Sequence, residues 1–294
     1  MYKKLVKPII TAAAVVSCSL MLAFPSQAAN VRTPAADGTV TYTSRDLVVD
    51  ASNTDDGYIM VKYSGKAPRI KVRIQKDTQY TYDLNTSGQY ETFPLTEGDG
   101  TYQIQVFENV SGSMYSTALN KQISVKLTDQ NSPFLYPNQF CNFSEDSDAM
   151  AVSDELVSGI TDPVKKVEAV YKYAVDNITY DYDKAKTVQS GYLPNIDDTL
   201  ETGKGICFDY ASLMSAMLRA QDIPTKLVIG YTGNVYHAWI SVYTKQQGWI
   251  DNIIYFDGTS WKFMDPTFAA SGKGDPTITE YINTPANYQA KFSY

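Results

Sequence analysis

Three side chains in the second half of the sequence have the types needed for covalent catalysis: Cys207, His237 and Asp265. A thiolate attacks a carbonyl carbon, an imidazole takes and returns the proton, and a carboxylate holds the imidazole in the useful tautomer. His237 is the only histidine among 294 residues, so a zinc site of the usual His/Cys type lacks ligands. We therefore predict a catalytic Cys207, His237 and Asp265, with no metal and no cofactor.

The sequence around Cys207 predicts that this residue opens a helix. Gly203 and Gly205 precede it, and Pro224 follows the end of the helical pattern. The apolar residues that share one helical face are Ile206, Tyr210, Leu213, Met214 and Met217. Free N–H groups and the positive end of the helix dipole favour a thiolate in the first turn. The same N–H groups can receive the oxyanion that forms when the thiolate attacks a carbonyl.

Three strand-like runs follow, at residues 226–231, 237–243 and 260–266. His237 opens the second run, and Asp265 closes the third just before a proline. If these two runs pair antiparallel, the start of one lies beside the end of the other. We therefore expect His237 and Asp265 to be neighbours at one edge of a sheet, with residues 246–258 as an insertion at the hairpin tip. Alone, each residue has an ordinary explanation, as a packed histidine or a strand-ending Asp-Pro.

The segments GICFDYASLMSAMLRAQDIPTKLVIGY, HAWISVY and WKFMDPTF resemble the transglutaminase-like superfamily of papain-type thiol enzymes. The resemblance covers roughly residues 148–272 and implies that Cys207, His237 and Asp265 correspond to the catalytic triad of the family. It also implies a cysteine at a helix start that packs against an antiparallel sheet. Asp222 stands where the family usually has glycine, which affects only a helix cap. The calcium sites of large animal transglutaminases have no counterpart that aligns.

The rest of the chain divides by pattern into further segments. Short alternating runs between turn residues predict an all-β, immunoglobulin-like sandwich at residues 38–128. A linker at 129–147 and a catalytic domain at 148–294 follow. The predicted fold class is therefore α+β, a papain/transglutaminase-like core preceded by an immunoglobulin-like sandwich. We expect the sandwich to act as a spacer or packing domain rather than as a tyrosine-based binding surface.

The first 28 residues have the pattern of a secretory signal peptide, with an early lysine-rich stretch, an apolar run and a small-residue cut site. A lipoprotein signal ending at Cys18 is the less favoured alternative, because the apolar run continues past this cysteine. We expect a secreted or cell-surface bacterial protein with no membrane span after cleavage. The net charge of −7 argues against nucleic acid as a partner. The sequence does not indicate an oligomeric state.

The predicted reaction is attack of the Cys207 thiolate on an amide or peptide carbonyl, which gives a thioester. Water completes a hydrolysis, whereas an amine completes a cross-link or a cyclisation. We expect a cysteine peptidase or amidase that acts on peptides or cell-wall stem peptides outside the cell. Tyr210, Tyr236 and Trp239 are candidate substrate contacts, with core packing as the alternative for each. Two other classes remain open: a catalytically silent cell-surface binding module, and an adhesin with a Cys141–Cys207 disulfide.

Overall fold

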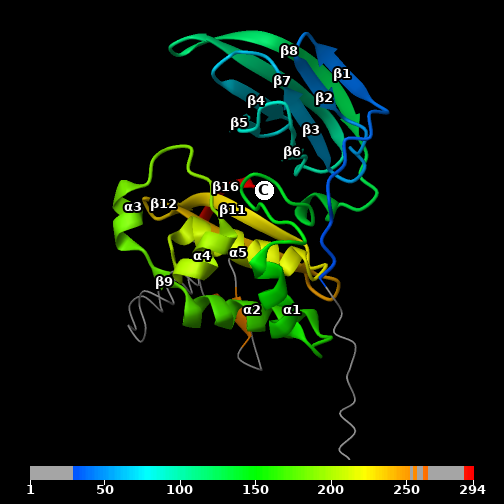
Figure 1. The fold of residues 1–294 in the computed structure, drawn as a ribbon. Coiled ribbons are helices and arrows are strands. Elements are labelled where there is room, and N and C mark those ends of the chain that lie inside the picture. Colours follow the sequence, from blue (N-terminus) through cyan, green and yellow to red (C-terminus); the bar gives the residue numbers. More distant parts are fainter. Residues whose placement is uncertain (1–28, 252–253, 257–260, 264–287) are drawn as a thin grey trace, which may run out of the picture.

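The computed structural model describes residues 29–251, 254–256, 261–263 and 288–294, and these residues form two lobes (Figure 1). The N-terminal lobe is made of β-strands, and the C-terminal lobe mixes helices with strands. The predicted signal peptide at 1–28, Asp265 and part of the predicted strand 260–266 lie outside the described residues. The fold is therefore a mixed α/β structure preceded by β-sheets.

The N-terminal lobe consists of two four-stranded antiparallel sheets. The strands are β1 (Thr41–Ser44), β2 (Leu47–Asp50), β3 (Tyr58–Tyr63), β4 (Ile70–Gln75), β5 (Gln79–Asp83), β6 (Tyr90–Pro94), β7 (Gly100–Ser111) and β8 (Met114–Val125). One sheet has the order β1-β2-β3-β6 and the other has the order β5-β4-β7-β8. Strands β5 and β8 are the two edges of the second sheet.

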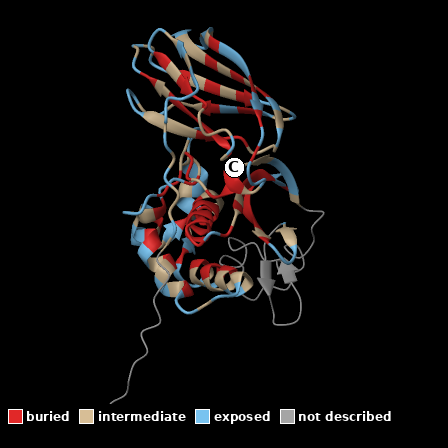
Figure 2. Ribbon diagram, turned by 90° about the vertical axis from the view of Figure 1, so that its right-hand side faces the viewer, coloured by how far each residue is buried: buried red, intermediate tan, exposed pale blue. Residues whose placement is uncertain are grey.

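Alternation of side chains explains how these sheets form a core. In β4, Ile70, Val72 and Ile74 are buried, whereas Lys71 and Arg73 are only partly buried, so the alternating sequence of this run gives one apolar face. Successive side chains of a strand point to opposite faces, so one face of each sheet can bury apolar residues. Figure 2 shows the buried residues alternating along these strands. The immunoglobulin-like topology of this lobe stays a prediction.

The C-terminal lobe places one buried helix at its centre. Its helices are α1 (Asp148–Val157), α2 (Pro163–Asn177), α3 (Tyr182–Thr187), α4 (Ile196–Thr202) and α5 (Cys207–Arg219). Helix α2 begins with Pro163, and Asp162 caps it by accepting a hydrogen bond from the Val164 N–H. Every residue of α5 from Asp209 to Arg219 is buried. Helix α5 lies between the sheet of this lobe and helices α1 and α2 (Figure 1).

The sheet that packs on α5 has the order β13-β12-β11-β16 and is antiparallel throughout. Its strands are β11 (Thr225–Thr232), β12 (Val235–Thr244), β13 (Gly248–Ile250) and β16 (Tyr288–Ser293). A two-residue parallel pair, β9 (Thr179–Tyr180) and β10 (Lys204–Gly205), lies just before α5. The first two predicted strands, 226–231 and 237–243, are confirmed as β11 and β12.

The predicted pairing of the second and third strand-like runs is wrong for the residues that the structure describes. Strand β15 (Trp261–Phe263) pairs with β14 (Ile254–Phe256) in a separate two-stranded sheet, whereas β12 pairs with β11 and β13. The physical reason is the segment between the two runs. It is long enough to supply two strands of its own, so each run finds a nearer partner in the sequence.

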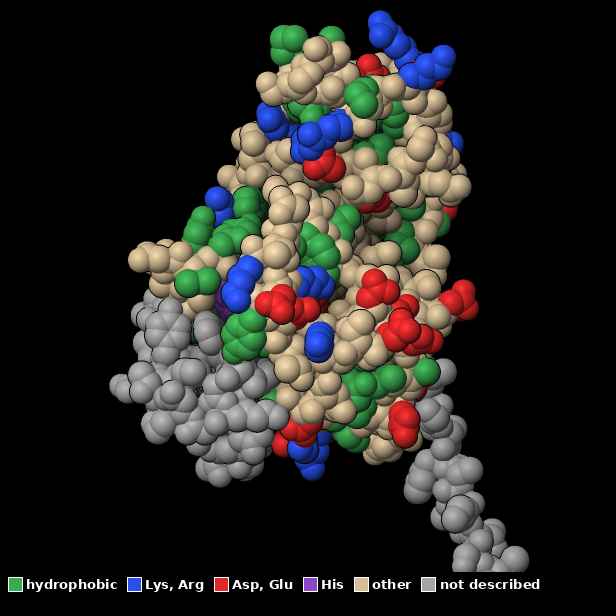
Figure 3. Space-filling view, turned by 60° about the vertical axis from the view of Figure 1, so that its left-hand side comes forward, with side chains coloured by type: hydrophobic (Ala, Val, Ile, Leu, Met, Phe, Trp, Pro, Cys, Tyr) green, Lys and Arg blue, Asp and Glu red, His purple; other side chains and the backbone are tan. Residues whose placement is uncertain are grey.

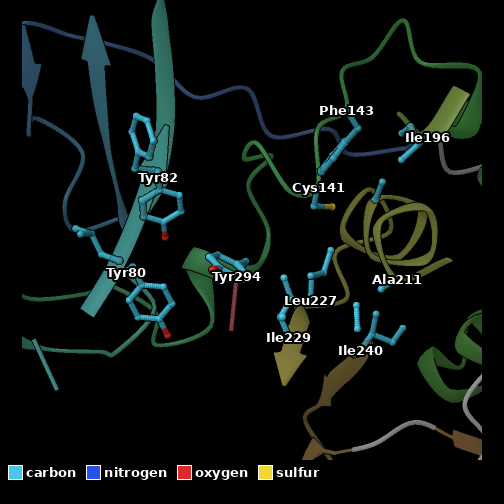
Figure 4. Packing of buried hydrophobic residues seen from close by; sticks show 14 of the residues in the cluster. Tyr80, Tyr82, Cys141, Phe143, Ile196, Ala211, Leu227, Ile229, Ile240 and Tyr294 are labelled. Carbon is cyan, nitrogen blue, oxygen red and sulfur yellow. The ribbon is translucent and has the colours of Figure 1, made fainter. Parts of the chain in front are cut away.

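The predicted linker packs closely between the two lobes. Phe140 contacts Tyr82 of β5, Phe208 of α5 and Tyr294, with ring centroids 5.8, 5.7 and 4.2 Å apart. Figure 4 shows Tyr80, Tyr82 and Tyr294 gathered at this junction, and Cys141 beside α5. Arg219 is fully buried and donates hydrogen bonds to the carbonyl oxygens of Tyr136, Thr225 and Tyr294. The linker is therefore part of the packed core.

None of the helices within the described residues is long and apolar enough to cross a membrane.

Candidate active site

Cys207 is the first residue of α5, as predicted, and it is partly exposed like Phe208, whereas Asp209 to Arg219 are buried. The segment before it is held by backbone hydrogen bonds to the chain after α2. Thr179 N–H donates to the Gly203 carbonyl (2.8 Å) and Asp181 N–H donates to the Gly205 carbonyl (2.9 Å). The first N–H groups of a helix have no acceptor within the helix. The fold therefore presents a thiol beside N–H donors at the start of a fixed helix.

Asp209 anchors this helix start from inside the protein. Its fully buried carboxylate accepts a hydrogen bond from the Ile206 N–H (2.8 Å), one residue before the cysteine. It also accepts hydrogen bonds from Lys184 Nζ (2.8 Å) and from the Tyr192 hydroxyl (2.5 Å). A Cβ on Gly205 would lie 2.7 Å from the Cβ of Asp209, so glycine is needed for this close approach.

The same cluster fixes the segment around α3 over the helix start. Lys184 Nζ also donates to the Tyr192 hydroxyl (2.6 Å), and its ammonium lies 4.5 Å from the centroid of the Tyr192 ring. Burial, together with the hydrogen bond to Asp209, raises the pKa of Tyr192 far above its ordinary value of 10.0. The tyrosine is therefore a neutral donor to a carboxylate whose charge is balanced by Lys184.

His237 lies on β12 directly opposite Gly230 of β11, and it is 5% exposed. Its ring stacks on Trp239, with centroids 6.2 Å apart and planes 24° apart. A Cβ on Gly230 would lie 2.8 Å from the Trp239 ring and 2.1 Å from the Gln289 carbonyl oxygen. The missing side chain at Gly230 thus makes room for the tryptophan that supports the imidazole.

Cys207 and His237 line one pocket of about 920 Å³ between the two lobes. Tyr180, Tyr192 and Phe208 form the aromatic part of its wall on the helical side. Tyr236 lines the same pocket and is 57% exposed. Partial burial, and to a smaller extent the charges of Tyr231 and Cys207, raise the pKa of Tyr236 above its ordinary value. A nucleophile, a base and aromatic side chains therefore share one space.

The structure separates the three predicted substrate contacts. Tyr236 lines the pocket, whereas Tyr210 is completely buried and its hydroxyl donates to the Ile178 carbonyl (2.5 Å). Trp239 is 3% exposed and contacts His237 and Tyr288. Core packing, the alternative stated for each of them, describes Tyr210 and Trp239. Asp265 lies outside the described residues, so its place beside His237 stays a prediction.

Lys184 and Tyr192 were not identified from the sequence. The sequence feature that points to a partner such as Lys184 is Asp209, which occurs two residues after the cysteine on a helix that is apolar on almost every side. A carboxylate at such a position is buried and needs a partner that neutralises it. That reasoning predicts a basic partner but not its position, because Lys184 is 25 residues away in an exposed, polar segment.

Cys141 and Cys207 are both free thiols in the structure. Cys141 is fully buried, and its Sγ approaches the carbonyl oxygen of Ser212 in α5 at 3.7 Å. Burial raises the pKa of the Cys141 thiol from 9.0 to about 11, with the Arg219 charge opposing the shift. Cys141 is therefore a packing residue beside α5, and it forms no disulfide with the candidate nucleophile.

Comparison with known proteins shows which family this part of the chain is similar to. Residues 150–252 match the model of the transglutaminase-like superfamily. A UPF0252 protein of Methanocaldococcus jannaschii is 30% identical over 116 residues, which is 38% of this chain and 30% of that protein. A protein-glutamine gamma-glutamyltransferase of Pseudomonas aeruginosa is 30% identical over 118 residues, which is 35% of this chain and 17% of that protein. The chain thus spans less than a third of the length of these curated relatives.

Among solved structures, a candidate cysteine protease from Cytophaga hutchinsonii superposes with a TM-score of 0.39 at 16% identity. The superposition covers 81% of this chain and 83% of that one. Residues 150–252 form a transglutaminase-like core, as the resemblance of the three motifs implied. This core contains Cys207 and His237.

Proposed function

We propose that the protein is a thiol hydrolase, a cysteine peptidase or amidase that acts on peptide substrates through a thioester on Cys207. The observation that carries this proposal is the shared pocket, because a partly exposed cysteine at a helix start and a buried histidine open into one space. The size of the pocket supports a peptide, since about 920 Å³ lies near the upper end of the usual range for bound molecules of drug size.

In the proposed acylation step, His237 takes the proton of the Cys207 thiol, and the thiolate attacks the substrate carbonyl. N–H groups at the start of α5 stabilise the oxyanion. The C–N bond then breaks, the leaving amine takes the proton from the imidazolium, and a thioester remains. In deacylation, water gives a proton to His237 and attacks the thioester. The C–S bond breaks, the departing thiolate takes the proton back from His237, and the carboxylic acid is released. Asp265 is proposed to hold the imidazole in the required tautomer.

The competing reaction is acyl transfer, in which an amine instead of water attacks the thioester. The name of the Pseudomonas relative, a protein-glutamine gamma-glutamyltransferase, motivates this second candidate. The two reactions share Cys207 and His237 and differ only in the acceptor. We further propose that the protein acts outside the cell, on peptides or cell-wall stem peptides, because residues 1–28 have the pattern of a signal peptide.

The test is turnover of a library of blocked peptides by the full chain, with and without an added primary amine, and with products identified by mass. We expect cleavage products in water that are lost in Cys207→Ala and in His237→Ala. If the amine adduct forms in place of the hydrolysis product, the protein is an acyl transferase and not a hydrolase. Turnover that survives Cys207→Ala would overturn the thiol mechanism altogether.

A further inference from the structure

The pocket that contains Cys207 has a second wall, which comes from the N-terminal lobe. Its residues there include Lys71 of β4 and Gln79, Thr81 and Asp83 of β5, together with Asn85 just after β5. In sequence these residues lie more than a hundred positions before the nucleophile. The sheet that the sequence suggested to be a spacer thus lies at the candidate active site.

Strand β5 has two faces with different roles. Tyr80 and Tyr82 are buried, whereas Gln79 and Thr81, which alternate with them along the strand, are exposed. β5 is an edge strand of its sheet, so within the described residues no neighbouring strand pairs with its outer edge. The alternation therefore directs two tyrosines into the protein and leaves two polar side chains free to meet a ligand.

The buried face of β5 is fixed to the catalytic lobe. Tyr80 contacts Phe292 and Tyr294, with ring centroids 5.4 and 5.6 Å apart, and Tyr82 contacts Tyr294 at 5.9 Å. Gln139 of the linker donates to the Asp83 carbonyl (3.1 Å). Figure 4 shows Tyr80, Tyr82 and Tyr294 facing one another between the lobes. Aromatic contacts of this kind favour one relative position of two surfaces, so the wall is preformed.

The two charged residues that line this wall pair with each other. Lys71 Nζ lies 2.6 Å from Asp83 Oδ1, and the exposed Arg69, which does not line the pocket, lies 3.8 Å from the same oxygen. The remaining members of the wall are Gln79, Thr81, Tyr82 and Asn85, which carry amides, hydroxyls and one aromatic ring. Figure 3 shows hydrophobic side chains where the two lobes meet. Neutral hydrogen-bonding groups beside aromatic rings suit an uncharged peptide backbone with apolar side chains.

We propose that β5 of the N-terminal lobe is a specificity surface, which binds an extended, uncharged stretch of the substrate peptide away from the bond that Cys207 attacks. This inference rests on the proposed function and extends it, because it assigns the substrate class and a role to the N-terminal sheet. Binding energy from such a remote contact is used to orient the reacting group, so substrates that lack it lose turnover.

The test compares two matched variants, Thr81→Trp and Thr117→Trp. Both positions are exposed threonines on edge strands of the same sheet, but Thr117 lies on β8 and is not part of the pocket wall. Tryptophan is well tolerated in strands, and at position 81 its bulk covers the wall that the N-terminal lobe contributes to the pocket. The probes are two substrates and one reagent. The substrates are a blocked octapeptide of alanine, threonine and phenylalanine and its dipeptide core with the same scissile bond, and the reagent is iodoacetamide, which alkylates Cys207.

We expect Thr81→Trp to reduce kcat/KM for the octapeptide by about tenfold or more. The kcat/KM for the dipeptide and the rate at which iodoacetamide alkylates Cys207 should stay unchanged. Thr117→Trp should match the wild type with all three probes. An octapeptide carrying lysine or glutamate in place of threonine should be turned over less well than the neutral one. Equal turnover of the octapeptide by wild type and Thr81→Trp would overturn the proposal.

A binding measurement separates this proposal from the proposed reaction. In the Cys207→Ala background, calorimetric titration with the neutral octapeptide should show binding that Thr81→Trp weakens and Thr117→Trp does not. If Thr81→Trp weakens octapeptide binding in this background but the wild-type protein does not turn the octapeptide over, the result would contradict the hydrolase function and support the specificity surface. Absence of octapeptide binding, or binding insensitive to Thr81→Trp, would overturn the specificity surface even if smaller amides are hydrolysed.

Discussion

The buried carboxylate of Asp209 accepts a hydrogen bond from the Ile206 N–H (2.8 Å) and thereby holds the residue that directly precedes the candidate nucleophile. An aspartate at this third helical position also interacts favourably with the positive end of the helix dipole. Lys184 balances its charge at 2.8 Å, so Asp209 anchors the start of α5 without leaving an unpaired negative charge beside a developing thiolate. Asp209 and Lys184 are positioning residues in this arrangement.

The first prediction concerns this pair. Lys184→Met leaves a fully buried carboxylate without its cation; removal of one partner of a fully buried pair costs about 3–5 kcal/mol, and the cost here is smaller because Lys184 is 30% exposed. We expect a lower free energy of unfolding and a fall in kcat with little change in KM, because the start of α5 shifts relative to His237. Lys184→Arg should restore much of the free energy of unfolding and much of kcat. A variant that loses stability but keeps kcat in its folded fraction would show that the pair is only structural.

The second prediction concerns the support of the histidine. Gly230→Ala places a Cβ 2.1 Å from the Gln289 carbonyl oxygen, and neither backbone segment can yield without shifting β11 against β16. We expect a loss of about 1–3 kcal/mol in the free energy of unfolding, together with a lower kcat because His237 lies directly opposite Gly230. Denaturant titration and steady-state kinetics measure the two effects.

Gly112→Ala is the control for Gly230→Ala. Gly112 lies in the turn between β7 and β8 with φ +53°, and a Cβ there meets nothing within 4 Å. Alanine in this left-handed conformation costs about 1–2 kcal/mol, so it tests stability loss alone. If Gly112→Ala lowers kcat as much as Gly230→Ala does, the effect at Gly230 is not specific to His237.

The third prediction concerns Tyr236, the one predicted substrate contact that lines the pocket. Tyr236 is 57% exposed, so little packing is lost when its side chain is truncated. We expect Tyr236→Ala to raise KM for peptides several-fold at nearly unchanged stability, and Tyr236→Phe to remain close to wild type because the ring provides the contact. Tyr115→Ala on β8 is the control away from the pocket. An unchanged KM in Tyr236→Ala would remove this residue from the binding surface.

Local pattern was enough to predict much of the site. The position of Cys207 at a helix start follows from two glycines and a following apolar face, and β11 and β12 follow from uninterrupted apolar runs. These features depend on residues close together in sequence. The prediction for the third strand-like run went wrong because strand pairing depends on competing partners, and β14 lies closer along the chain than β12 does.

Contacts between distant segments could not be predicted from pattern. The stacking of Trp239 on His237 and the space left by Gly230 require the register of β11, β12 and β16. The placement of Thr81 in the wall of the Cys207 pocket requires the docking of two lobes. That docking depends on aromatic residues scattered from Tyr80 to Tyr294, which in the sequence look like ordinary strand residues.

The last prediction concerns alkaline pH. Burial raises the pKa of Cys141 to about 11 and, together with a hydrogen bond to Asp56, that of Tyr136 to about 12, compared with 9.0 and 10.0 for the free groups. Above pH 9 the unfolded chain releases the thiol proton while the folded protein retains it, so the free energy of unfolding falls as pH rises. For Cys141 alone the loss between pH 9 and about 11 is about 2–3 kcal/mol.

Thermal unfolding midpoints measured across this range should therefore decrease with pH. In Cys141→Ala the decrease between pH 9 and 10 should be shallower, because buried tyrosines begin to contribute only above about pH 10. Iodoacetamide at pH 9 should modify Cys207 in the native protein and Cys141 only after unfolding, since a buried neutral thiol neither reacts nor reaches the reagent. Native-state alkylation of Cys141, or an unchanged pH slope in Cys141→Ala, would contradict its burial as a neutral thiol beside α5.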